Sequence, residues 1–137
     1  SVIDGISYFY AEVKRLKLLL DELKGKSNLP LLFLIDEIFK GTNNIERLIG
    51  SRSFIKSIAG KNGLGCVTTH DLELVKLADE INEIRNFHFR EEVHTGKMHF
   101  DYVLREGPCP TTNALRIMEL EGLPVEKINQ ENGKNVN

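Results

Sequence analysis

The chain has 137 residues, enough for one domain with a hydrophobic core or for part of a larger domain. Its 41% hydrophobic and 28% charged residues are typical of a globular protein, and its net charge of −2 excludes a global basic field that would attract nucleic acid. No apolar run reaches the roughly 20 residues of a membrane span and no signal peptide is visible, so we expect a cytoplasmic protein. Cys66 and Cys109 match no metal or disulfide spacing, which fits a reducing compartment. The first residue, Ser1, is not methionine, and we expect a fragment of a longer protein.

The first half of the chain carries the signals of helices that alternate with strands. Apolar residues recur in steps of three and four over residues 6–24, which predicts a helix. Residues 31–35 are apolar at every position, as in a strand that is covered on both faces within a parallel sheet. A second helix is expected to end near Gly60, and residues 64–69 are expected to form another short buried strand.

The pattern changes after residue 82, where apolar and polar residues alternate on both sides of a short polar turn. This alternation predicts an antiparallel hairpin with Thr95 and Gly96 at its turn. A two-residue loop places the apolar side chains of both strands on one face. The expected pairs are Val93 with Met98 and Phe89 with Tyr102.

Two further helices and a tail complete the expected organisation. Asp71 is expected to cap a helix that runs through Ala78, and a last helix is expected over residues 110–121. The polar residues 125–137 are expected to form a frayed tail after one domain at residues 1–124. The order of elements predicts an α/β fold in which a mostly parallel sheet is flanked by helices and followed by an antiparallel hairpin.

Polar residues suited to catalysis follow both of the expected parallel strands. The first strand ends in Asp36 and Glu37, and the second is followed by His70. An apolar strand that ends in Asp-Glu is typical of the Walker B segment of nucleotide hydrolases, in which the Asp holds Mg²⁺ and the Glu polarises the attacking water. Because neighbouring parallel strands present their carboxyl ends at the same edge, we expect Glu37 and His70 to lie together.

Two other interpretations fit parts of this pattern. Asp36 and Glu37 can simply end a strand and cap the next helix, since short motif matches produce false positives. His70 and Asp71 match the dyad of an HD-type phosphohydrolase, but that metal cluster requires a histidine further upstream. The other three histidines all lie downstream of His70, so we set this interpretation aside.

Four motifs in the right order resemble the second half of the ATPase domain of the MutS family of DNA mismatch repair proteins, within the ABC-type P-loop ATPases. "DGISYFYAEV" (4–13) resembles the signature loop of the family, and "LFLIDEIFKGTN" (32–43) resembles its Walker B segment. "GTNNIER" (41–47) resembles the D-loop, and "VTTHDLEL" (67–74) is similar to the loop that carries the switch histidine. The resemblance covers residues 4–124 and implies a P-loop NTPase-like partial domain.

The resemblance implies a role for each matching residue. Asp36 matches the Mg²⁺ residue, Glu37 the catalytic carboxylate, and His70 the histidine that contacts the γ-phosphate of ATP. Ser7 matches the signature serine that reaches the nucleotide of the opposite subunit. We expect Ser7 to precede a helix, where an anion can bind, although a plain helix N-cap explains it equally. The residues that match the D-loop at the dimer interface are Asn43, Asn44 and Glu46.

The same resemblance implies ATP and Mg²⁺ as cofactors and a second copy of the ATPase domain as a partner. Mismatched or structured DNA is an expected partner of domains upstream of this chain. Several positions depart from the family pattern and indicate a divergent member. Residues 107–115 lack the Ser-x-Gly-rich stretch expected before the last helix, and three single residues stand where Thr, Asp and a small residue are usual. They are Tyr8, Glu46 and Arg47.

The phosphate-binding loop Gly-x-x-x-x-Gly-Lys-Ser/Thr is missing from the chain. "GKS" at residues 25–27 is not this loop, because Leu20 occupies the position of its first glycine. We therefore expect the Walker A half upstream of Ser1 and no activity for the fragment alone. A degenerate ATPase-like dimerisation scaffold is the alternative function, but a scaffold would require neither Glu37 nor His70.

Overall fold

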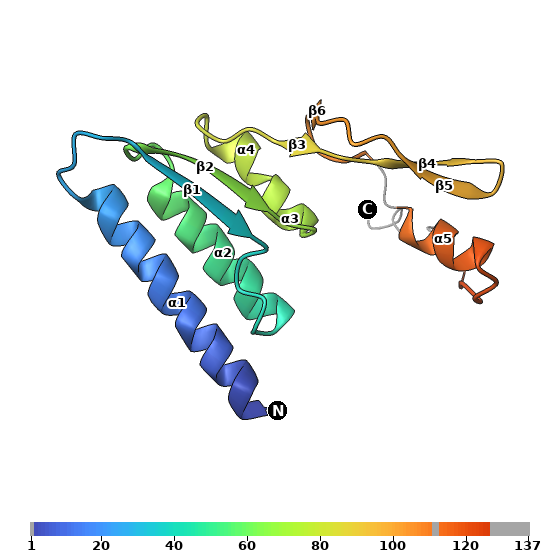
Figure 1. Cartoon of the computed structure of the whole chain (residues 1–137), viewed down its shortest axis with the longest axis horizontal. Helices are drawn as coiled ribbons and strands as arrows, with labels where there is room; N and C mark the ends of the chain where they lie inside the picture. The colour runs from blue at the N-terminus through green and yellow to red at the C-terminus, as the bar shows by residue number, and fades with distance from the viewer. Residues whose placement is uncertain (1, 111–112, 127–137) are drawn as a thin grey trace, which may run out of the picture. The chain divides into compact units, whose positions relative to one another are not determined.

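A computed structural model of the chain describes residues 2–110 and 113–126. The chain divides into two compact units, residues 1–86 and residues 87–137, which we describe separately. Figure 1 shows the elements of both units. None of the helices in the described part of the chain is long and apolar enough to cross a membrane.

The first unit contains two parallel strands and four helices. Strand β1 (Leu31–Asp36) pairs in parallel with β2 (Gly63–Thr68), from Leu31 opposite Gly63 to Asp36 opposite Thr68. This pairing confirms that the two apolar runs are parallel neighbours, joined by a helical crossover. The helices are α1 (Val2–Lys24), α2 (Asn44–Ile58), α3 (Leu72–Val75) and α4 (Leu77–Glu80).

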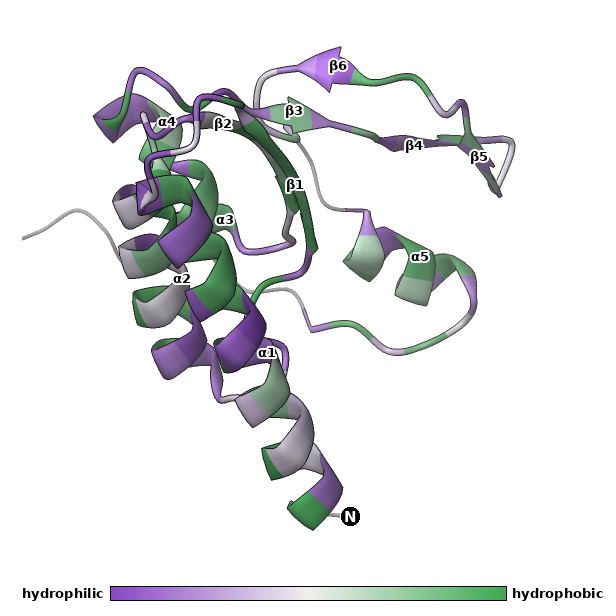
Figure 2. Cartoon of the chain, turned by 60° about the vertical axis from the view of Figure 1, so that its left-hand side comes forward, coloured by the Kyte–Doolittle hydropathy of each residue, from purple (hydrophilic) through white to green (hydrophobic). Residues whose placement is uncertain are grey.

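The core of this unit lies between the sheet and its helices. Four buried apolar side chains, with Leu77 only 1% exposed, form its centre. Half-buried residues of β1, β2 and α2 pack against them, so one face of the sheet is covered. Figures 1 and 2 show α1 and α2 on the same side of the two strands. The central residues are Leu16, Ile38, Leu74 and Leu77.

The other face of the sheet is exposed, which corrects the expectation of a strand covered on both faces. Leu32 is 67% exposed, Leu34 is 76% exposed and Leu64 of β2 is 71% exposed. Accessibility along β1 alternates between half-buried and exposed positions although every residue from 31 to 35 is apolar. Figure 2 shows the hydrophobic character of both strands. Within this unit, all the covering helices lie on one face.

Two expectations about helices in the first unit were wrong in detail. Helix α1 begins at Val2, so Ser7 lies inside the helix and does not precede it. The backbone N–H groups after Ser7 are therefore not free at a helix start. Asp71 does cap a helix, since its Oδ1 accepts a hydrogen bond from the Glu73 N–H over 3.1 Å. That helix is interrupted at Lys76, where α3 gives way to α4.

The second unit contains a hairpin, as expected. Strands β4 (Glu91–His94) and β5 (Lys97–Phe100) are antiparallel and place Val93 opposite Met98. Thr95 and Gly96 form the turn with positive φ angles of 51° and 72°, the backbone that two-residue hairpin loops favour.

The expected Phe89–Tyr102 pair is not formed. Strand β3 (Phe87–His88) pairs with β6 (Arg105–Glu106), and residues 89–90 oppose residues 101–104 between the two ladders. Tyr102 has a φ of 57°, and its ring meets that of Phe100 edge-on at 4.7 Å between centroids. The longer segment therefore bulges out of the ladder.

The last helix, α5 (Ala114–Leu120), is shorter than the expected 110–121. Residues 111–112 and most of the expected tail, 127–137, lie outside the described residues. The three small sheets of the described chain comprise one parallel and two antiparallel pairs.

Candidate functional site

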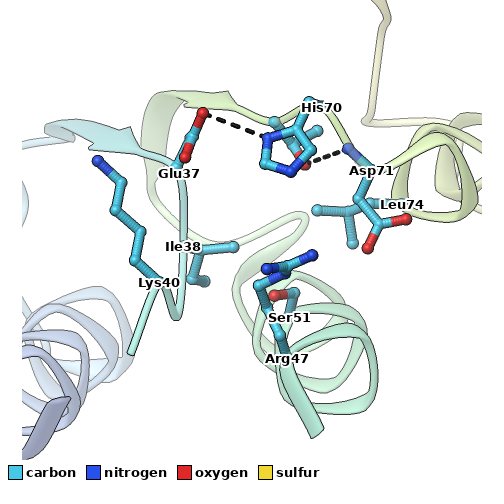
Figure 3. Close-up of a pocket in the computed structure, with 9 residues that line it drawn as sticks. Glu37, Ile38, Lys40, Arg47, Ser51, His70, Asp71 and Leu74 are labelled. Atoms are coloured by element: carbon cyan, nitrogen blue, oxygen red, sulfur yellow. Dashed lines mark hydrogen bonds and ion pairs between the residues drawn. The ribbon is translucent and has the colours of Figure 1, made fainter. Parts of the chain in front are cut away.

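The carboxyl ends of β1 and β2 bring the predicted catalytic residues together. Asp36 ends β1 directly opposite Thr68, which ends β2. One residue further on, Glu37 Oε1 lies 3.3 Å from Nδ1 of His70 (Figure 3). The expectation that Glu37 and His70 lie at one edge of the sheet is therefore confirmed.

Asp36 is held by a hydrogen bond across the strand ends. The Thr68 hydroxyl donates to Asp36 Oδ1 over 2.6 Å, and Lys40 Nζ lies 3.7 Å from Oδ2. The Thr68 hydroxyl, and secondarily the Lys40 charge, lower the pKa of Asp36 below its usual value. The Asp36 side chain is 85% exposed, so this carboxylate is ionised and accessible to a ligand.

The chain turns sharply after β1, at Glu37 and Phe39. Glu37 and Phe39 have φ angles of 50° and 57°, in the left-handed region that non-glycine residues rarely adopt. The Glu37 N–H donates to the Thr68 hydroxyl over 3.0 Å. The Phe39 N–H donates to Glu12 Oε1 of α1 over 2.6 Å. Backbone conformations of this kind cluster at functional sites, where surrounding contacts hold them in place.

A cavity of about 170 Å³ adjoins the Glu37–His70 pair. Its wall comes from the turn after β1, the loop after β2 and helix α2 (Figure 3). Lys40 and Arg47 contribute cationic groups to it, and Ser51 contributes a hydroxyl. A second, larger cavity of about 380 Å³ lies between α2 and the covered face of the sheet and includes neither carboxylate.

The D-loop residues predicted to bind nucleotide lie outside this cavity. Asn43 caps α2, since its Oδ1 accepts from the Glu46 N–H over 2.9 Å. Glu46 in turn accepts hydrogen bonds from Asn43 Nδ2 and from the Thr42 hydroxyl, at 2.8 Å and 2.7 Å. Asn44 is the exposed first residue of α2. In this chain Asn43 and Glu46 stabilise a helix start, and Ser7 belongs to a different element, α1.

The residues around Asp36 fit a Mg²⁺ ion that takes one ligand from this chain and its other ligands from phosphate oxygens and water. No group of three His, Cys, Asp or Glu side chains able to hold a metal occurs among the described residues. Mg²⁺ typically uses one or two carboxylates and completes its octahedron with phosphate oxygens and water. The single accessible carboxylate of Asp36 suits that arrangement.

Several residues at the site were not predicted from the sequence as site residues. Thr68 is identified by the register of two parallel strands, and Glu12 by a hydrogen bond between residues 27 positions apart. Neither contact leaves a local sequence signal. Arg47 and Ser51 are four positions apart on α2, a spacing that puts them on one face of the helix. That spacing was the signal available for Ser51, whereas Arg47 also departs from the family pattern.

Comparison with known proteins gives a consistent result. The family described as MutS domain V matches residues 1–136. The chain is similar to "DNA mismatch repair protein MutS" of Aquifex pyrophilus, with 28% identity over 92% of the chain, and of Chloroflexus aurantiacus, with 29% over 93%. The protein of that name in Leuconostoc mesenteroides is 30% identical over 90% of the chain. These matches cover only 13–14% of the relatives' own length.

Proposed function

Because the chain belongs to the MutS domain V family, we propose that it is the second half of a P-loop ATPase domain in a MutS-like DNA mismatch repair protein. The observation that carries this proposal is the position of Glu37 beside His70, next to the accessible carboxylate of Asp36. The names of the similar proteins support the mismatch repair part of this role.

Each residue at the strand ends has a proposed task. Asp36 would hold Mg²⁺, which supplies charge stabilisation for the phosphates of ATP. Glu37 orients and polarises the water that attacks the terminal phosphate, and its contact with His70 holds the carboxylate toward the cavity. His70 donates a hydrogen bond to that phosphate. The phosphate-binding loop that completes the site has no counterpart in these 137 residues, so hydrolysis requires residues from outside the chain.

We also propose how this module communicates with its partners. Two ATPase domains associate when nucleotide is bound, and Ser7, Asn43 and Asn44 lie at their interface. Ser7 reaches the nucleotide of the opposite subunit through its hydroxyl. Domains outside this chain bind mismatched or structured DNA, and the whole protein works in the cytoplasm.

The test uses the full-length protein that carries this chain. Glu37→Gln keeps the size of the side chain but removes its charge, so ATP binding should survive while single-turnover hydrolysis falls by roughly 10²–10⁴-fold. Asp36→Asn should weaken Mg²⁺-dependent ATP binding, because the metal loses its carboxylate. Glu22→Gln, at an exposed position of α1, is the control for charge removal.

Two results would contradict the proposal. Unchanged hydrolysis in Glu37→Gln would remove this residue from the reaction. Equal loss of ATP binding in both variants would mean that the two carboxylates serve the structure alone. Either result would favour the alternative of a dimerisation scaffold that has lost catalysis.

A further inference from the structure

Helix α2 presents an arginine without a partner to the cavity beside Glu37 and His70. Arg47 is half-buried, and its guanidinium makes no hydrogen bond or ion pair with any of the described residues. Figure 3 shows this guanidinium between Ile38 and the loop that carries Asp71. The same helix has a paired arginine, since Arg52 donates to Glu80 over 2.6 Å. Arg47 therefore differs from its neighbour in having unused donors that face a cavity.

One turn along the same helix face, a serine hydroxyl is buried without a partner. Ser51 is 2% exposed and lines the same cavity, and its Oγ has no hydrogen-bond partner among the described residues. Other serines of α2 donate to the backbone of the preceding turn, as Ser53 does to Ile49 O over 2.8 Å. A buried hydroxyl without a partner is rare, because burial removes it from water. The Ser51 hydroxyl is therefore available to donate to a ligand that enters the cavity.

The carboxylates in the cavity wall already have partners of their own. Glu37 Oε1 lies 3.3 Å from His70, and Asp71 Oδ1 accepts from the Glu73 N–H over 3.1 Å. Arg47 and Ser51 thus add donors that have no partner of their own to the cavity wall that also carries His70, and Lys40 adds a positive charge to the same wall. The cavity of about 170 Å³ has room for several waters, at roughly 30 Å³ each, or for one tetrahedral anion.

We propose that Arg47 and Ser51 form a phosphate-binding subsite in this cavity. The planar guanidinium binds two phosphate oxygens in parallel, and the serine hydroxyl donates to one of them. The proposal rests on the proposed ATPase function in naming the ligand, which is the terminal phosphate of ATP or the inorganic phosphate released from it. Both sources share one chemistry, and separate measurements distinguish them.

The experiment measures binding to the full-length protein by titration calorimetry with ATP, ADP and inorganic phosphate. Arg47→Gln should weaken binding of ATP and of inorganic phosphate by about tenfold or more, the scale of one charge-assisted hydrogen bond, and should leave ADP binding unchanged. Arg47→Lys should retain part of the affinity. Ser51→Ala should weaken the same two ligands by about threefold to tenfold. Arg52→Gln and Ser53→Ala on the same helix are the matched controls.

The results separate this subsite from the proposed ATPase function. If Arg47→Gln and Ser51→Ala leave ATP and phosphate affinity unchanged while Glu37→Gln abolishes hydrolysis, the subsite is overturned and the ATPase function stands. If both variants lose phosphate affinity while Glu37→Gln hydrolyses ATP normally, the subsite stands and the ATPase role of Glu37 fails. Equal losses in Arg47→Gln and Arg52→Gln would overturn the subsite, because the effect would then be one of general charge. Ser51→Ala removes a single hydroxyl, so it tests the subsite even if Arg47→Gln does not fold.

Discussion

Glu12 of α1 holds the backbone of Phe39 in the turn after β1, with 2.6 Å between Glu12 Oε1 and the Phe39 nitrogen. Phe39 has a φ of 57°, so this hydrogen bond supports a conformation that the residue would not otherwise favour. Phe9 lies on α1, as Glu12 does, and the centroid of its ring is 6.2 Å from the centroid of the Phe39 ring. Helix α1 and the turn that carries Glu37 are therefore joined by both polar and apolar contacts.

We expect Glu12→Ala to destabilise the first unit by about 1–3 kcal/mol, because the part-buried Phe39 N–H loses its acceptor. Urea unfolding of the purified chain measures this loss. Glu22→Ala, at an exposed position of the same helix, is the control and should change stability by less than about 0.5 kcal/mol. Equal stability of the two variants would show that the Glu12 contact contributes nothing.

Thr68→Val should raise the pKa of Asp36 toward its usual value, because the hydroxyl that donates to Asp36 is the main cause of the lowered pKa. A lowered folded-state pKa stabilises the fold above the ordinary pKa of an aspartate and ceases to do so as the pH falls. The variant should therefore be less stable than the parent near neutral pH, and this difference in stability should become smaller in acid. Carboxyl ¹³C NMR titration of Asp36 measures the shift, with Thr69→Val as the control. An unchanged Asp36 titration would contradict the assignment.

Gly65→Ala should destabilise the chain by about 1–3 kcal/mol, the usual cost of overpacking. A methyl group at Gly65 would lie 1.9 Å from Cε2 of Phe33 on the neighbouring strand, so the ring has to move. Gly5→Ala is the matched control, since nothing lies within 4 Å of its added Cβ. Alanine stabilises a helix by about 0.8–1 kcal/mol relative to glycine, so this variant should not be destabilised. Thermal unfolding of both variants is the measurement. A Gly65→Ala protein as stable as the parent would mean that the Phe33 ring relocates freely.

Glu80 should stabilise the fold in a pH-dependent manner. Hydrogen bonds from Arg52 and then Lys56 lower its pKa from 4.5 to about 2. The stabilisation is complete above pH 4.5 and is lost as the pH falls toward 2. Glu80→Gln should therefore be less stable than the parent at pH 7, and the difference should disappear by about pH 2. Urea unfolding across this range measures it; a difference independent of pH would exclude the ion pairs as its cause.

The central pair of strands could be predicted from sequence because its signals are local and strong. Two short apolar runs separated by a helical pattern give a parallel pair, and the polar residues after them must then meet at one edge. The hairpin turn was likewise predictable, since Thr95-Gly96 suits a two-residue loop. These are the features on which the Glu37–His70 contact depends.

Other features depend on tertiary contacts that a single sequence does not reveal. An all-apolar strand has the same pattern whether one face or both are covered, so the exposure of Leu32 and Leu34 could not be read from it. The bulge at residues 101–104 disrupts an alternation that looks regular in the sequence. The start of α1 at Val2 was missed because helix boundaries are set by weak local preferences.

The exposed leucines of the sheet also determine how the chain responds to temperature. Water in contact with Leu32, Leu34 and Leu64 raises the heat capacity of the chain, and covering them would lower it. The driving force for covering these side chains is mainly entropic near 25 °C, so it weakens on cooling and is strengthened by sulfate. A calorimeter can therefore report whether this face of the sheet is wet or dry without any knowledge of what lies against it.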